Sequence, residues 1–131
     1  MDLTKIILPI NKELDVFQTQ FSKSMKSNVA LIDLITRYIL RQKGKKIRPA
    51  LVILSAKLCG KVNERTYTGA NLVELLHTAT LIHDDVVDDA KTRRGIASIN
   101  AVWKNKVSVL MGDFLLSKGL LVALDNDEFR F

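Results

Sequence analysis

Apolar residues recur at spacings of three and four along the first part of the chain, and this pattern limits the fold to helices. Between residues 5 and 26 the apolar positions at this spacing are Ile6, Ile10, Leu14, Phe17 and Phe21. One face of an α-helix returns every 3.6 residues, so the pattern indicates an amphipathic helix. Only 6 Gly and 2 Pro interrupt the 131 residues, which favours long helices. With no strand-like alternation, the expected fold is an all-α, antiparallel helical bundle.

The remaining helices are delimited by residues that favour helix ends. Asn28 and Asn63 are suitable N-caps. Pro49 suits a first helical turn and Gly60 a helix end. The expected helices cover about 29–42, 49–60 and 64–89, followed by a loop at 91–96 and one or two helices at about 98–106 and 108–124. No linker or repeat divides the chain, so residues 1–131 are expected to form a single all-α domain.

Composition narrows the class of protein further. The chain is 47% hydrophobic and 26% charged, which is typical of a globular protein. Its net charge of +6 favours an anionic partner, whether nucleic acid, membrane surface or phosphorylated metabolite. The single Cys59 excludes an internal disulfide and is expected to be buried. With no apparent secretory signal and no apolar stretch of about 18 residues, we expect a cytoplasmic protein without a transmembrane segment.

An acidic cluster stands at the end of the expected helix 64–89. It consists of four carboxylates in six residues, Asp84-Asp85-Val86-Val87-Asp88-Asp89. A helix C-terminus carries partial negative charge, so these carboxylates oppose the local preference. Asp84 and Asp88 share a helix face, about 6 Å apart along the axis. This arrangement suits Mg²⁺, which takes oxygen ligands from one or two carboxylates together with water and phosphate. The alternative is a solvated acidic face paired with the basic residues that follow it.

Two basic clusters flank the carboxylates. One contains Lys45, Lys46 and Arg48, and the other is Arg93-Arg94. Arginine binds phosphate oxygens bidentately and lysine acts as a point charge. The combination of carboxylates and cations therefore indicates two phosphate-bearing ligands, one of them held through a metal. The alternatives are exposed loop charge for the first cluster and ion pairs to the aspartates for the second.

One histidine shares the face of the acidic pair. His77 precedes Asp84 by seven residues, two helical turns, and this alignment predicts a role with the substrate. His83 lies about 100° round the helix from Asp84, and no catalytic role is assigned to it.

Three motifs resemble those of the trans-type isoprenyl (polyprenyl) diphosphate synthases. Residues 81–95 read LIHDDVVDDAKTRRG, which resembles that family's first aspartate-rich motif, DDxxD followed by RRG. Residues 44–49 read GKKIRP, which is similar to its GKxxRP motif, and residues 112–117 read GDFLLS, which resembles the segment that follows in polyprenyl synthases. The resemblance implies the N-terminal half of an isoprenoid synthase fold.

The resemblance also implies a role for each matched residue. Asp84 and Asp88 would bind Mg²⁺ ions that hold an allylic diphosphate, with Asp85 in support. Arg93 would contact the allylic diphosphate. Four residues would hold isopentenyl diphosphate: Lys45, Arg48, His77 and Arg94. The implied reaction is a head-to-tail condensation, in which the allylic C–O bond ionises, the isopentenyl double bond attacks, and a proton is lost.

Product length is a further expectation. The allylic tail should run from the acidic cluster back along its helix, past Thr80, Ala79 and Leu76. In short-chain members of the family, bulky aromatic residues near these positions close the pocket. Ala79 and Thr80 are small, so the resemblance implies a long, octaprenyl-like product.

The chain departs from the family by lacking a second DDxxD motif. After Asp89 its only aspartates are Asp113, Asp125 and Asp127. We therefore expect an N-terminal fragment that is inactive or nearly so by itself and that forms a homodimer through exposed apolar faces. Three alternatives stay open: a non-catalytic partner subunit of an intact synthase, an HD-type metal phosphohydrolase using His77, His83 and Asp84, and a basic nucleic-acid-binding module, which the acidic cluster disfavours.

Overall fold

The computed structural model describes residues 2–42 and 44–125, and Asp127, to which no role was assigned, lies outside them. In chain order the elements are α1 (Leu3–Ile7), the short 3₁₀ turn η1 (Leu8–Ile10), α2 (Asn11–Ser24), α3 (Ala30–Arg41), α4 (Ile47–Cys59), α5 (Glu64–Val87), β1 (Thr92–Arg93), β2 (Ile96–Ala97) and α6 (Ile99–Asp125). The expected all-α fold is confirmed, with one small antiparallel hairpin added to it.

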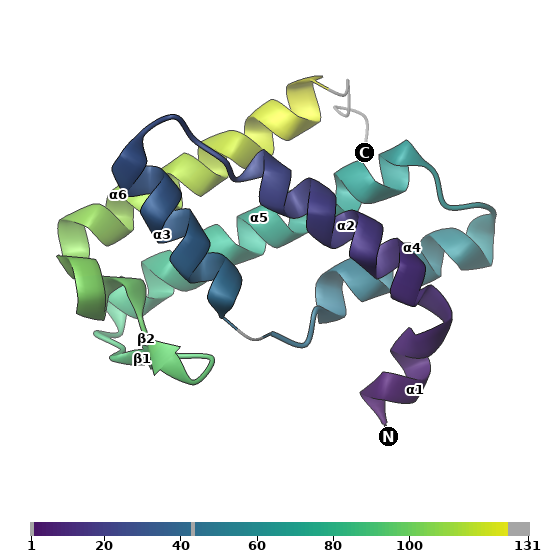
Figure 1. The fold of residues 1–131 in the computed structure, drawn as a ribbon, viewed down its shortest axis with the longest axis horizontal. Coiled ribbons are helices and arrows are strands. Elements are labelled where there is room, and N and C mark those ends of the chain that lie inside the picture. The colour runs from purple at the N-terminus through teal and green to yellow at the C-terminus, as the bar shows by residue number, and fades with distance from the viewer. Residues whose placement is uncertain (1, 43, 126–131) are drawn as a thin grey trace.

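α5 is the central helix, and three other helices pack against it (Figure 1). α6 runs antiparallel beside α5, while α2 and α4 contact other parts of its surface. The side chains buried where these helices meet include Phe17, Phe21, Ile53, Leu75 and Leu115. Because α5 is held along its length, the acidic cluster at its C-terminal end is carried by a well-packed element.

One of the expected helices is interrupted, and two others are parts of a single kinked helix. The helix expected over residues 5–26 divides into α1, η1 and α2, and Pro9 lies in the 3₁₀ turn between them. Proline has no N–H to donate and clashes with the preceding helical turn, which explains the break. α6 contains a non-helical residue, Lys104, with φ 68° and ψ 170°. The two helices expected at 98–106 and 108–124 therefore correspond to two parts of α6, divided slightly earlier than expected.

Three local expectations are wrong. Val29, not Asn28, is the N-cap residue of α3, and no side chain caps this helix. Cys59 ends α4 and is exposed rather than buried. The segment 91–96, expected as a loop, forms most of the β1–β2 hairpin, in which Thr92 pairs with Ala97 and Arg93 with Ile96. Strands of two residues are too short to produce a recognisable alternation in the sequence.

α6 is long and apolar enough to cross a membrane by length and composition alone, with a mean hydropathy of 1.8 over an 18-residue window. The expectation that no segment meets this criterion is therefore not confirmed. The property is weak evidence for membrane insertion, since a core helix of a soluble protein also has it. Part of α6 packs on α5, where Met111 and Leu115 are buried.

The N-terminus of α5 is capped as the sequence predicts. The Asn63 side chain accepts a hydrogen bond from the Thr66 N–H (3.2 Å), and the Thr66 hydroxyl accepts one from the Asn63 N–H (3.2 Å). This reciprocal capping box satisfies two backbone donors that have no partner inside the helix.

Removing the cap should destabilise the protein. We expect Asn63→Ala to lower the free energy of unfolding by about 1 kcal/mol, as measured by urea denaturation. Asn28→Ala is the matched control, since Asn28 does not cap α3, and it should change stability by less than about 0.5 kcal/mol. Equal losses in the two variants would contradict the assignment.

Candidate functional site

The acidic cluster divides into three exposed carboxylates, of which Asp89 pairs with Lys91, and one buried carboxylate. Asp84 lies in the last turn of α5 and Asp88 is its C-cap, with the Asp88 N–H donating to the Asp84 carbonyl oxygen (2.8 Å). Both residues are exposed, and neither carboxylate has a hydrogen-bond or ion-pair partner within residues 2–42 and 44–125. Asp85, in contrast, is only 4% exposed. Asp84 and Asp88 are therefore the members of the cluster available to a ligand.

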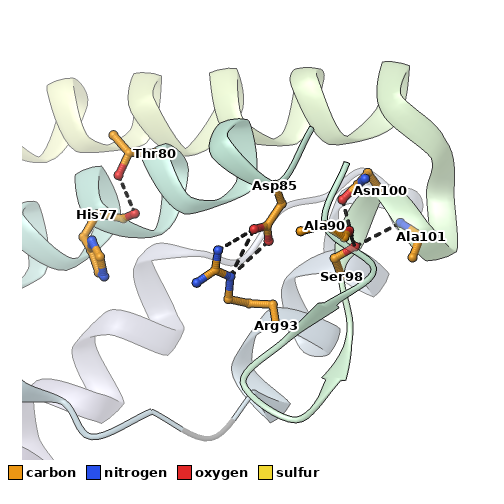
Figure 2. Close-up of polar contacts among 8 residues, drawn as sticks. All are labelled: His77, Thr80, Asp85, Ala90, Arg93, Ser98, Asn100 and Ala101. Carbon is orange, nitrogen blue, oxygen red and sulfur yellow. Dashed lines mark hydrogen bonds and ion pairs between the residues drawn. The ribbon is translucent and has the colours of Figure 1, made fainter. Parts of the chain in front are cut away.

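Asp85 is held by Arg93 from the hairpin (Figure 2). The Arg93 Nε lies 3.2 Å from Asp85 Oδ1 and 3.1 Å from Oδ2, and the Arg93 Nη2 also donates to Oδ1. This hydrogen bonding to the Asp85 carboxylate raises the pKa of Arg93. For Arg93, the alternative of an ion pair back to the aspartates is therefore confirmed. Its expected contact with an allylic diphosphate stays a prediction.

Further polar contacts fix the position of the hairpin. The Ser98 hydroxyl donates to the Ala90 carbonyl oxygen (2.6 Å) and accepts from the Ala101 N–H (3.2 Å), as an N-cap side chain does (Figure 2). From α3, the Tyr38 hydroxyl donates to the Ala97 carbonyl oxygen. The hairpin is thus anchored to α3, to the start of α6 and, through Arg93, to α5.

The hairpin tip brings the two basic clusters together. Arg94 occupies the turn with φ 52°, an uncommon conformation for a residue other than glycine. Its guanidinium lies against Gly44, where a Cβ would be 2.8 Å from Arg94 Nη1. Gly44 and Arg94 line a cavity of about 120 Å³ together with Lys46, the N-cap of α4. Residues about fifty positions apart in the sequence therefore meet at one place.

Glu74 is a site residue that the sequence analysis missed. This partly buried glutamate of α5 lines the same cavity as Lys46 and Arg94. Burial raises the pKa of Glu74, while Arg94, Arg48 and Lys46 act in the opposite direction. Glu74 precedes His77 by three residues, so helical spacing was the signal that could have revealed it.

His77 faces the same group of cations. Burial lowers the pKa of His77, and the positive charges of Arg48, Arg94 and Arg93 lower it further. The structure therefore places His77 near three of the expected diphosphate-binding arginines. Lys45 and Arg48 are exposed at the start of α4, as a site for a soluble anion requires.

The three residues expected to line a chain-length pocket do not share one exposed surface. Ala79 is 0% exposed and Leu76 packs towards Gly119 of α6. Thr80 is exposed, and its hydroxyl donates to the His77 carbonyl oxygen (2.8 Å) (Figure 2). Their role in setting product length stays a prediction.

Metal binding by this chain would rest on few protein ligands. Within the described residues, no group of three or more His, Cys, Asp or Glu side chains is arranged to hold a metal ion. The exposed pair Asp84 and Asp88 nevertheless fits Mg²⁺, which often uses one or two carboxylates and completes its shell with water and phosphate. The HD-type phosphohydrolase alternative is disfavoured, because His83 contacts Asp113 and the Val109 carbonyl oxygen on α6 instead of joining a metal cluster.

Comparison with known proteins identifies the family. The family model described as polyprenyl synthetase matches residues 29–128. The chain belongs to the polyprenyl synthetase family. It is 39% identical over 124 residues to an all-trans-nonaprenyl-diphosphate synthase of Rhodobacter capsulatus. This alignment covers 92% of this chain and 38% of that protein. It is also 39% identical over 118 residues to the octaprenyl diphosphate synthase of Escherichia coli (strain K12), covering 90% of this chain and 36% of that protein.

Solved structures of polyprenyl synthases have the same fold. A polyprenyl synthase from Caulobacter crescentus CB15, complexed with calcium and isoprenyl diphosphate, matches with a TM-score of 0.91 and 30% identity over 98% of this chain and 39% of that one. A decaprenyl diphosphate synthase from Rhodobacter capsulatus matches with a TM-score of 0.88 and 33% identity over 95% of this chain and 38% of that one. This polyprenyl synthetase chain therefore spans little more than a third of the length of these relatives.

Loss of Arg93 should be costly because it leaves the buried Asp85 carboxylate without its cation. We expect Arg93→Leu to lower the free energy of unfolding by about 3 kcal/mol in urea denaturation. Asp89→Asn breaks an exposed pair with Lys91 and should cost less than about 1 kcal/mol. The double variant Arg93→Leu with Asp85→Leu should lose less than Arg93→Leu, because no buried charge remains. A loss for Arg93→Leu as small as that of the control would contradict the argument.

The cations around His77 should be visible in its titration. By NMR, the His77 ring should titrate below pH 6.5, and Arg48→Gln should move the midpoint upward by removing one nearby positive charge. Lys57→Gln, elsewhere on α4, is the control and should leave the midpoint unchanged. Since folding lowers this pKa, the contribution of His77 to stability is complete above about pH 6.5 and is lost as the pH falls through the lowered value. A midpoint at or above 6.5 would contradict the arrangement.

Proposed function

We propose that this chain supplies the diphosphate-binding N-terminal part of a Mg²⁺-dependent polyprenyl diphosphate synthase. The proposal rests on two exposed carboxylates, which have no hydrogen-bond or ion-pair partner in the part of the chain that the structure describes, and on a nearby group of cations. Asp84 and Asp88 stand at the end of α5, and Arg94, Lys46 and Arg48 gather beside the same helix. The first group suits a metal-bound diphosphate and the second suits a free diphosphate.

Each group of residues has a distinct task in this proposal. Asp84 and Asp88 would hold Mg²⁺, which would supply positive charge beside the diphosphate of the allylic substrate. Arg93 orients Asp85, and its positive charge lies next to the metal-binding pair. Four residues bind isopentenyl diphosphate: Lys45, Arg48, His77 and Arg94. The substrates would thus be held with their reacting carbons close together, which lowers the entropic part of the barrier.

The relatives support this substrate class. The Caulobacter polyprenyl synthase was crystallised with calcium and isoprenyl diphosphate, a divalent cation together with a diphosphate ester. The Rhodobacter and Escherichia relatives are named for nonaprenyl and octaprenyl products, consistent with the long product expected from the small residues Ala79 and Thr80. The inactivity or near-inactivity of residues 1–131 by themselves, a homodimeric assembly and a cytoplasmic location stay predictions, as does the alternative of a non-catalytic partner subunit.

Metal-dependent binding of inorganic diphosphate tests the proposal. By isothermal titration calorimetry, the chain should bind diphosphate more tightly with Mg²⁺ than with EDTA. Asp84→Asn and Asp88→Asn should each weaken the Mg²⁺-dependent binding about tenfold or more, which corresponds to about 1.4 kcal/mol. Arg94→Gln should weaken binding both with and without Mg²⁺.

Asp89→Asn is the matched control for charge. It removes one carboxylate from the same cluster, but Asp89 is paired with Lys91 and is not assigned to the metal. It should leave Mg²⁺-dependent binding unchanged. Diphosphate binding that does not respond to Mg²⁺, or an equal loss in all three aspartate variants, would contradict the assignment of Asp84 and Asp88.

A further inference from the structure

We propose that His83 is a positioning residue: its ring, seated on Gly112 of α6, fixes the last turn of α5 and thereby the directions of Asp84 and Asp88. The consequence for metal binding rests on the proposed function, whereas the effect on the last turn of α5 does not. His83, Gly112 and Asp113 thereby have a role, although the expected chemistry does not use them.

The ring of His83 occupies space that only glycine leaves free. A Cβ built on Gly112 would lie 2.2 Å from His83 Nε2, 2.4 Å from Cδ2 and 2.9 Å from Cε1. All three distances are below 3.0 Å, a separation that real Cβ atoms essentially never show, and they involve three atoms of a flat, rigid ring. Gly112 itself is buried in the middle of α6, where glycine is otherwise unfavourable. Close approach of the imidazole explains why glycine stands there.

Polar contacts hold the ring in this position. His83 Nε2 lies 3.2 Å from the Val109 carbonyl oxygen and 3.3 Å from Asp113 Oδ1. Both partners are acceptors, so Nε2 carries the hydrogen that is shared between them. Val109 and Asp113 are four residues apart on α6 and bracket Gly112, so the ring is fixed between adjacent turns of that helix.

Because His83 is next to Asp84 in the sequence, its contact with α6 also fixes the orientation of Asp84 and Asp88. His83 immediately precedes Asp84, and Asp85 on the other side is held by Arg93. The last turn of α5 is therefore fixed on two sides, to α6 through His83 and to the hairpin through Asp85. A turn held in this way cannot rotate about the helix axis. Asp84 and Asp88 therefore keep their directions although their carboxylates have no hydrogen-bond or ion-pair partner among residues 2–42 and 44–125.

Backbone amide exchange tests the positioning without reference to any ligand. In His83→Ala, the Asp88, Asp89 and Ala90 amides, which close the end of α5, should exchange about tenfold faster, while the Leu75 amide in the middle of α5 is unchanged. Gly112→Ala should have the same local effect. Uniformly faster exchange along α5 would indicate general destabilisation and would overturn the proposal, as would no change at the three amides.

Diphosphate calorimetry tests the consequence for the site. Gly112→Ala should weaken Mg²⁺-dependent diphosphate binding about tenfold and leave binding in EDTA unchanged. Adding Gly112→Ala to His83→Ala should weaken Mg²⁺-dependent binding hardly further, since the added methyl group then has no ring to displace. Such non-additivity indicates that the two residues are in direct contact. His83→Gln, which retains an N–H donor for the same acceptors, should stay within about threefold of the unmodified chain.

Gly119→Ala is the matched control. It makes the same substitution seven residues later on α6, where a Cβ would lie 3.4 Å from the flexible Leu76 side chain. It should alter neither amide exchange at the end of α5 nor Mg²⁺-dependent binding. If the unmodified chain shows no Mg²⁺-dependent binding, the proposed function is wrong, and amide exchange still decides whether His83 positions the turn. Metal-dependent binding unchanged in Gly112→Ala would overturn the inference.

Discussion

The ion pair between Asp85 and Arg93 is the contact on which the arrangement of the site depends. It joins the end of α5 to a hairpin of two-residue strands that has little stability of its own. A buried carboxylate is tolerated only with a cation and good hydrogen bonds, so the hairpin must stay where Arg93 can reach Asp85. The same constraint places Arg94, one residue later, against Gly44 and the basic start of α4. This ion pair, together with the contacts of Tyr38 and Ser98, thus determines where two separate groups of charges meet.

Positive charge exceeds negative charge around Glu74 and His77. Arg94, Arg48 and Lys46 all act on Glu74, a carboxylate whose pKa burial raises. The same two arginines oppose protonation of His77. The region therefore carries more positive than negative charge, and an anion with several oxygens would be attracted to it. The exposed Asp84 and Asp88, in contrast, form a negative site suited to a cation. The two sites lie along one face of α5, which suits two diphosphates of which one is bound through a metal.

Much of the fold and part of the site could be predicted from the sequence. The apolar periodicity of the chain predicted the helices, and Asn63 correctly marked the start of α5, because caps and periodicity act over a few residues. The exposure of Asp84 and Asp88 also agrees with their expected roles. The predictions that Asn28 caps α3 and that Cys59 is buried were wrong. Several residues near a helix start can cap it, and the burial of a side chain depends on which other elements pack against it. Glu74 was missed because its importance comes from cations far away in the sequence.

The sequence by itself determined the helical class, the acidic and basic motifs, and the resemblance that the family comparison confirmed. Only the tertiary structure decided which charges are paired. In the tertiary structure Arg93 pairs with Asp85, while Asp84 and Asp88 have no partner among the described residues. The His83 ring lies against Gly112 rather than beside a ligand. Helix formation and motif chemistry depend on residues within a few positions of each other. Pairing and burial depend on long-range packing of α5 against α6 and the hairpin, which no local pattern specifies.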